Sequence, residues 1–223
     1  MASSLDELVD RARAGLSRSG RRVIGVAGSP GAGKTTLVEA LLRALTPAAD
    51  QPGGWPDGWV AHVPMDGYHL ADVELSRLGR LERKGAPDTF DAAGYAALLR
   101  RLHATYGSSV TVYAPAFDRE LEQPLAGAIA VPPECRLVLT EGNYLLLDDG
   151  DWHQVREHLD EVWFLDADDD LRRGRLVARH IRFGKSPADA EAWVDDVDEP
   201  NARRVTSTRG GADVIVAASV LPA

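Results

Sequence analysis

The sequence predicts an α/β fold in which helices flank a mostly parallel central sheet. Short apolar runs typical of buried strands alternate with helical patterns from residue 23 to residue 216. Such alternation is typical of parallel strands joined by helical crossovers, with functional groups at the carboxyl ends of the strands. The 223 residues, 44% of them hydrophobic, are enough to bury such a core. We find no repeat or linker that divides the chain, and we expect one domain over residues 1–223.

The first predicted element is an amphipathic helix over residues 4–18, within an N-terminal segment 1–20 that packs against the sheet. Leu5, Leu8 and Leu16 recur at helical spacing. A serine at position 3 or 4 is a typical helix cap, and Gly20 is a typical stop.

A glycine-rich turn at residues 28–35 joins a predicted strand, residues 23–27, to a predicted helix. The turn has the spacing G-x-x-x-x-G-K-[ST], in which glycines let backbone N–H groups surround phosphates at a helix N-terminus. Lys34 would place its positive charge beside the β- and γ-phosphates of ATP, and the Thr35 hydroxyl would bind Mg²⁺. The predicted nucleotide-binding residues are Gly28, Ser29, Gly31, Ala32, Gly33, Lys34, Thr35 and Thr36.

The middle of the chain is predicted in less detail. Residues 46–58 are rich in proline and glycine and should be a surface connection, residues 59–64 a second strand, and residues 70–84 a helix. A helix is expected from Asp91 to about Tyr106, then a strand at 110–113 that ends before residues 114–120. The proline-containing segment 121–135 should form an irregular hairpin.

The C-terminal third returns to regular alternation. Strands are predicted at residues 136–140, 161–165 and 212–216, and a helix at 152–159. A charged helix should cover residues 169–183. Ser186 and Pro187 are a typical cap and first-turn pair for the next helix, which should end near Thr208.

Composition excludes several classes of partner. The net charge of −9 argues against nucleic acid, because a phosphate backbone requires a basic surface. No targeting segment or membrane span is visible, so we expect a cytoplasmic protein without a membrane partner. The single cysteine, Cys135, cannot form an internal disulfide. Of 25 basic residues only Lys34, Lys84 and Lys185 are lysines, a bias that by itself predicts no function.

Two carboxylates follow predicted strands. Asp66 comes just after the second strand, where it could take a proton from a phosphate acceptor, although Asp66-Gly67 is equally typical of a turn. Glu141 ends an apolar strand, which suits a carboxylate that reaches Mg²⁺, and the alternative is an ordinary strand-end acid. Whether Asp66 or Glu141 is the base stays open at this stage.

Four arginines recur at helical spacing within the predicted helix 169–183. They could close over a triphosphate and neutralise charge in the transition state. Without further context, a solvated face paired with Asp168, Asp169 and Asp170 is favoured. The four are Arg172, Arg175, Arg179 and Arg182.

Several stretches together resemble one family. They are residues 28–35, 65–69, 113–119, 141–144 and 175–185. The chain resembles, over about residues 20–217, the P-loop kinases that include uridine kinase, phosphoribulokinase and type I pantothenate kinase. It is most similar to a bacterial branch of nucleoside, nucleotide or fructose kinase-like proteins. The resemblance implies a P-loop NTPase fold with a helical lid at about residues 168–186.

The resemblance also implies an ATP-dependent kinase that phosphorylates a hydroxyl of a small molecule. Asp66 would be the catalytic base, assisted by Lys34, Arg175 and Arg179, while Thr35 and Glu141 would hold Mg²⁺. The implied acceptor pocket contains Tyr68, His69 and Arg119, and we add Asp118 and Tyr144 as candidate acceptor-binding residues. A homodimer is an allowed assembly.

The acceptor itself stays open between a nucleoside, a sugar and a pantothenate-like molecule. Uridine kinases and phosphoribulokinases carry aspartate-serine where this chain has Asp66-Gly67, which is nearer to pantothenate kinase, yet the chain is shorter than pantothenate kinase. Residues 117–119 combine an apolar side chain with both charge signs, which suits one polyol. The alternative is a structural Asp118–Arg119 pair in a surface loop.

Two other classes share the phosphate-binding loop. A GTPase usually recognises guanine through Asn-Lys-x-Asp, and none of the three lysines follows an asparagine. A regulatory nucleotide-binding module, or an NTPase without a small-molecule acceptor, would need neither Asp66 nor a pocket beside the γ-phosphate.

Overall fold

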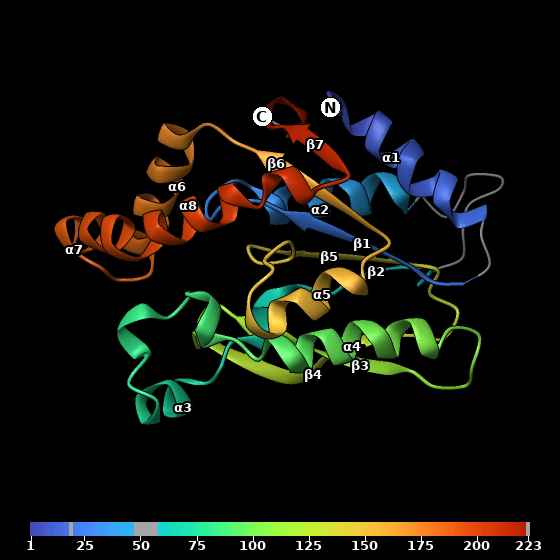
Figure 1. The fold of residues 1–223 in the computed structure, drawn as a ribbon, viewed down its shortest axis with the longest axis horizontal. Coiled ribbons are helices and arrows are strands. Elements are labelled where there is room, and N and C mark those ends of the chain that lie inside the picture. Colours follow the sequence, from blue (N-terminus) through green and yellow to red (C-terminus); the bar gives the residue numbers. More distant parts are fainter. Residues whose placement is uncertain (18–19, 47–57, 222–223) are drawn as a thin grey trace.

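A five-stranded parallel sheet, in the order β2-β5-β1-β6-β7, forms the centre of the molecule (Figure 1). The computed structural model describes residues 1–17, 20–46 and 58–221. The strands are β1 (Arg22–Ala27), β2 (Val60–His62), β5 (Leu137–Gly142), β6 (Glu161–Asp166) and β7 (Val214–Ala217). All five coincide with predicted strands, so the predicted α/β fold is confirmed.

Helices cover both faces of this sheet, because its strands are apolar on both faces. Along β1, Val23 and Ala27 belong to one hydrophobic core, and Ile24 and Val26 belong to the other. The helices α1 (Leu5–Ala14) and α2 (Lys34–Leu45) supply apolar side chains to the second core. The helices α4 (Ala92–Ala104) and α5 (His153–Glu157) supply them to the first, on the opposite side of the sheet (Figure 1).

The predicted N-terminal helix is shorter than expected. Ser4 caps α1 by accepting a hydrogen bond from the Glu7 amide at 3.2 Å. The α-helix ends at Ala14, and a single 3₁₀ turn (Gly15–Ser17) continues it. Its buried face lies in the same core as α2, as an amphipathic helix requires.

The segment from residue 110 to 135 is more regular than the sequence suggested. The strand β3 (Val112–Asp118) runs beyond the predicted residues 110–113 and pairs antiparallel with β4 (Gln123–Val131) as a separate two-stranded sheet. A register shift between Ala114 and Ala116 accommodates Pro115 inside β3. The strand β4 pairs with β3 alone, so the N–H that Pro124 lacks does not interrupt the hydrogen bonds of this sheet. The segment predicted as an irregular hairpin is therefore a regular one.

The predicted helix over residues 70–84 is broken. The helix α3 covers only Asp72–Arg77, and Gly79, at φ +66°, turns the chain before a 3₁₀ turn at Leu81–Arg83. A left-handed residue cannot continue a helix, which explains the difference. The following helix is as predicted, because Asp91 accepts a hydrogen bond from the Gly94 amide at 2.8 Å and caps α4.

Three consecutive helices form the arm at the left of Figure 1. The helix α6 (Asp169–Arg182) is capped by Asp168, and α7 (Pro187–Trp193) is capped by Ser186 with Pro187 in its first turn. A π-helical turn (Val194–Asp198) then leads into α8 (Glu199–Ser207). The predicted long helix from Ser186 is therefore present, with one wide turn inside it.

The expected surface connection over residues 46–58 lies almost wholly outside the described residues. Among the helices that are described, none is both long and apolar enough to cross a membrane.

Candidate active site

The phosphate-binding loop joins β1 to α2 and is pressed against its neighbours. Gly31 and Gly33 have φ angles of +78° and +98°, in the left-handed region that favours glycine. A Cβ on Gly31 would lie 2.6 Å from the Arg172 carbonyl oxygen, and one on Gly33 would lie 2.8 Å from a Leu221 methyl. Gly31 is therefore required by conformation and by packing, and Gly33 chiefly by conformation, in addition to the approach of phosphates predicted from the sequence.

Lys34 is buried at the first turn of α2. Its ammonium donates hydrogen bonds to the carbonyl oxygens of Gly28 (2.9 Å) and Ser29 (3.1 Å) and to Asn143 Oδ1 (2.6 Å). Burial lowers the pKa of Lys34 to about 8, against the opposing charges of Glu141 and Asp66. Asn143 was not predicted as a site residue; its position just beyond the carboxyl end of a buried strand was the available signal.

Thr35 and Glu141 meet at the carboxyl edge of the sheet. Because β1 and β5 pair in parallel with Val26 opposite Glu141, the carboxylate lies beside the start of α2. The Thr35 hydroxyl donates to Glu141 Oε1 at 3.1 Å. Burial, and then the nearby charge of Asp66, raise the pKa of Glu141 to about 7.

The donor set formed by Thr35 and Glu141 fits a magnesium ion. Mg²⁺ prefers oxygen ligands and keeps several waters or phosphate oxygens, so one hydroxyl and one carboxylate suffice. No group of three or more histidine, cysteine or carboxylate side chains within the described ranges could hold a metal by itself. The residues present therefore suit an ion that arrives with a nucleotide.

Asp66 is held beside Glu141 by the order of the strands. The strand β2 pairs with β5, and the Val63 amide continues this pairing by donating to the Leu139 carbonyl at 2.9 Å. Asp66 follows in a 3₁₀ turn (Met65–Tyr68). A Cβ on Gly67 would lie 2.4 Å from the Pro115 carbonyl oxygen, so close packing of this turn on β3 explains glycine at that position.

The Asp66 carboxylate forms an ion pair with Arg119, which follows β3. Burial opposes the charged form of Asp66, but the positive groups His69, Arg119 and Lys34 outweigh it and hold its pKa below the ordinary value. Asp66 is consequently ionised at neutral pH, as a proton acceptor must be.

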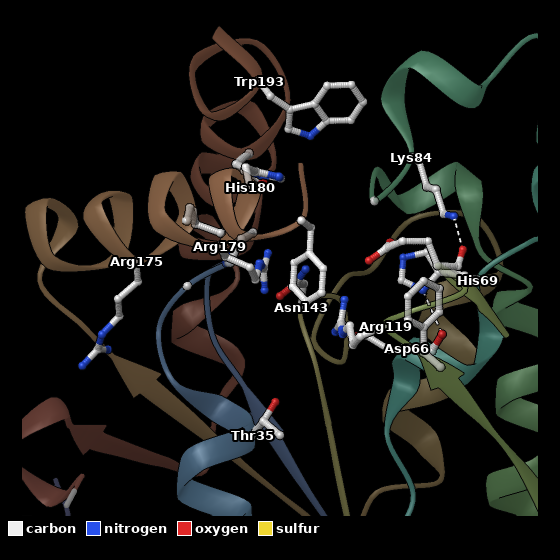
Figure 2. Close-up of a pocket in the computed structure, with 18 of the residues that line it drawn as sticks. Thr35, Asp66, His69, Lys84, Arg119, Asn143, Arg175, Arg179, His180 and Trp193 are labelled. Carbon is white, nitrogen blue, oxygen red and sulfur yellow. Dashed lines mark hydrogen bonds and ion pairs between the residues drawn. The ribbon is translucent and has the colours of Figure 1, made fainter. Parts of the chain in front are cut away.

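One cavity of about 640 Å³ extends from the phosphate-binding loop past Asp66 (Figure 2). His69 lies on its far wall, where its ring packs 4.0 Å from Phe90 and 4.7 Å from Phe117, centroid to centroid. The His69 Nδ1 lies 2.8 Å from the Asp66 carbonyl oxygen. The cavity also contains residues that were not predicted as site residues: Lys84, Phe90, Asn143, His180, Lys185 and Trp193.

Three of the predicted acceptor residues lie outside this cavity. The Tyr68 ring packs on Tyr95 with centroids 5.2 Å apart. Asp118 accepts hydrogen bonds from two backbone amides of its own turn, both at 2.9 Å. Tyr144 is buried and its hydroxyl donates to the Gly85 carbonyl at 2.5 Å. The polar atoms of Asp118 and Tyr144 are used by the fold, and Tyr68 is not among the residues that line the cavity, so His69 and Arg119 are the predicted acceptor residues that the structure brings there.

The predicted arginine stripe on α6 is divided among different surroundings. Arg172 is buried in ion pairs with Asp169 and Glu199, so its charge is used within the fold. Arg175 lies 3.5 Å from the Ala32 carbonyl, whereas Arg179 points into the cavity (Figure 2). Arg182 is not among the residues that line it.

Arg179 has no hydrogen bond or ion pair with the described residues, and its side chain lines the cavity while staying accessible to solvent. Partial desolvation beside the cavity walls, and then the charge of Arg119, lower the pKa of Arg179. A guanidinium that lines the cavity without a carboxylate partner keeps its N–H groups available to an anion that enters there.

Fold and site together define a P-loop kinase: a parallel sheet, a glycine-rich loop that opens into a helix, and two carboxylates on neighbouring strand ends. The chain belongs to the phosphoribulokinase / uridine kinase family, whose model matches residues 23–215.

Relatives are found among fungal and bacterial proteins. The uridine kinase-like protein C227.14 of Schizosaccharomyces pombe is 34% identical over 85% of this chain and 79% of its own length. YggC of Escherichia coli is 32% identical over 88% of this chain and 77% of its own length. A fructose transport system kinase-like protein from Silicibacter sp. TM1040 superposes with a TM-score of 0.79 at 33% identity, over 95% of this chain and 98% of its own.

Proposed function

We propose that this protein transfers the γ-phosphoryl group of ATP to a hydroxyl group of a small molecule. The observation that carries the proposal is the single cavity into which both the phosphate-binding loop and Asp66 open. A nucleotide that reaches the loop and an acceptor beside Asp66 would therefore share one enclosed space, as direct phosphoryl transfer requires.

Each side chain in this cavity has a distinct part. Lys34 holds the β- and γ-phosphates, while Thr35 and Glu141 bind Mg²⁺, which supplies charge neutralisation when bound. Asp66 accepts the proton of the attacking hydroxyl. Arg179 neutralises charge that develops on the transferred group, because it lies unpaired in the same cavity.

Asp66 is a better base than Glu141 on geometric grounds. Glu141 accepts the hydroxyl hydrogen bond of Thr35, on the metal side of the site. Asp66 instead pairs with Arg119, on the side of the cavity that extends away from the loop. This second compartment also argues for a kinase over a regulatory nucleotide-binding module, since such a module needs no space for an acceptor.

The test is an acceptor panel in a coupled assay of ADP release, with ATP and with GTP as donors. At least one nucleoside, sugar or pantothenate-like acceptor should stimulate ADP release several-fold over ATP alone. In Lys34→Ala this release should disappear, and calorimetry should show weaker ATP binding. ADP release that no acceptor stimulates would contradict the kinase proposal, and release that survives in Lys34→Ala would contradict the assignment of the loop.

A further inference from the structure

Every lysine of the chain lines the cavity that contains Asp66 and the phosphate-binding loop. Only six of the 25 basic residues lie there, yet these include Lys34, Lys84 and Lys185, the three lysines of a protein that otherwise uses arginine. Lysine and arginine are not equivalent, because an ammonium is a compact point charge with three donors, whereas a guanidinium is a planar fork. Lys34 belongs to the nucleotide loop, which leaves Lys84 and Lys185 without a role in the proposed reaction.

Lys84 is fixed with one donor unused. Its ammonium donates to Asp72 Oδ1 at 2.7 Å and to the Glu122 carbonyl at 2.5 Å, and it lies 5.4 Å from the centroid of the Phe117 ring. Two of its three N–H groups are thereby satisfied. The third is available to a ligand in the cavity that Lys84 lines.

Lys185 is fixed by the end of α6. Gly184, at φ +99°, donates to the Ile181 carbonyl at 3.0 Å, and the Lys185 amide donates to the His180 carbonyl at 3.1 Å, which together form a Schellman motif. Ser186 then caps α7. This short connection holds the Lys185 ammonium 4.0 Å from the centroid of the Trp193 ring.

The Lys185 ammonium has no hydrogen bond or ion pair with the residues that the structure describes. Trp193 and Lys84 lie on facing elements at the end of the cavity remote from Thr35 (Figure 2). Because Lys84 is in an ion pair with Asp72, Lys185 supplies the unpaired positive charge at this end of the cavity, and Lys84 supplies a fixed N–H donor.

We propose that the acceptor carries an anionic group, a phosphate or a carboxylate, which Lys84 and Lys185 bind at the end of the cavity away from its reacting hydroxyl. This inference rests on the proposed kinase function, and it selects charged sugars and sugar acids over neutral nucleosides and sugars. The acceptor hydroxyl lies toward Asp66 and the anion toward Trp193, so the acceptor spans the cavity.

The anion site can be tested without turnover. Inorganic phosphate is titrated by calorimetry into the full chain saturated with Mg-ADP, which keeps the nucleotide loop occupied, and acetate is titrated in parallel to separate phosphate from carboxylate recognition. Lys84→Gln and Lys185→Gln should each bind the preferred anion roughly tenfold to a hundredfold more weakly, the scale of a charged hydrogen bond. The exposed Arg43→Gln is the matched control and should bind like the wild type.

A variant that should bind the anion more tightly complements the two lysine variants. Glu122 lines the same cavity, so Glu122→Gln removes a repulsive charge and should tighten anion binding. Equal affinity in the wild type, both lysine variants and the arginine control would overturn the proposal, as would a wild type that binds neither anion.

Turnover with matched acceptors separates this inference from the kinase proposal. Fructose is compared with fructose 6-phosphate, and glucose with gluconate; the charged member of a pair should have the lower KM, and Lys185→Gln should remove the difference. Anion binding that depends on the lysines, without turnover of any acceptor, would support the site and refute the kinase. Turnover with the same KM for the charged and the neutral member of each pair, in the wild type and in Lys185→Gln alike, would support the kinase and refute the anion site.

Discussion

Arg119 and Asp66 form an ion pair across the acceptor side of the cavity, although they are 53 residues apart in the chain. Arg119 also lies 4.9 Å from the centroid of the Phe117 ring. The guanidinium is thus held by a carboxylate and an aromatic face, and its remaining N–H groups can face an acceptor. The predicted alternative, an ion pair between Asp118 and Arg119 in a surface loop, is not what the structure contains.

Arg119→Lys should raise the KM for the acceptor and leave the KM for ATP unchanged. Lysine keeps the positive charge beside Asp66 but loses the planar fork, which binds a carbonyl or an anion with two parallel hydrogen bonds. Steady-state kinetics with either substrate varied measures both constants. Two constants equal to those of the wild type would remove Arg119 from the acceptor site.

Asp66→Asn should lower kcat roughly 10²–10⁴-fold with little change in nucleotide affinity, the range expected when a general base is removed. Asparagine keeps the size of the side chain and the 3₁₀ turn, but it cannot accept a proton. Calorimetric titration of Mg-ATP and a thermal melt serve as controls for binding and folding. Turnover that survives in Asp66→Asn and is lost in Glu141→Gln would assign the base to Glu141 instead.

Arg179→Ala and Arg175→Ala should have different effects, although both residues belong to the predicted stripe. Arg179 points into the cavity without a partner among the described residues, so its removal should lower kcat roughly 10²–10³-fold, the scale of one transition-state contact. Arg175 lies against the phosphate-binding loop at Ala32, so its removal should act mainly on the KM for ATP. Single-turnover kinetics at saturating substrates distinguishes the two, and equal losses of kcat would contradict the division.

The stability of the fold should fall as the pH is lowered from about 6.5 to about 4. Burial lowers the pKa of His62 to about 4, and the Asp66 charge opposes this only in part. Between the two pKa values the unfolded chain binds a proton that the folded chain does not, so the free energy of unfolding rises with pH across this window.

Urea unfolding at several pH values measures this dependence. In His62→Gln, the change in the free energy of unfolding between about pH 4 and pH 6.5 should be smaller than in the wild type by roughly 1–3 kcal/mol, since one pKa unit corresponds to about 1.4 kcal/mol. His153→Gln is the matched control, because His153 is exposed. Wild-type and His62→Gln curves with the same slope would show that His62 is not the group responsible.

The sequence by itself determined the elements that depend on local pattern. The five strands of the central sheet, the glycine-rich loop, the start of a helix at Asp91 and the cap at Ser186 follow from periodicity and from side chains that bond to nearby amides, so these were predicted. That the chain forms a single domain over residues 1–223, with a lid at about residues 168–186, stays a prediction.

The tertiary structure alone decided which of the candidate residues meet. The strand order β2-β5-β1 brings Asp66 and Glu141 to the nucleotide loop. The strand β3 extends to Asp118, so that Arg119, the next residue, lies beside Asp66. The same packing turns Tyr144 inward.

Likewise, Lys84 and Lys185 come to one cavity from segments about 100 residues apart. Helical spacing could not separate Arg172, Arg175 and Arg179, because each faces a different neighbour. Contacts between distant segments depend on how the elements pack, and no local pattern encodes that packing.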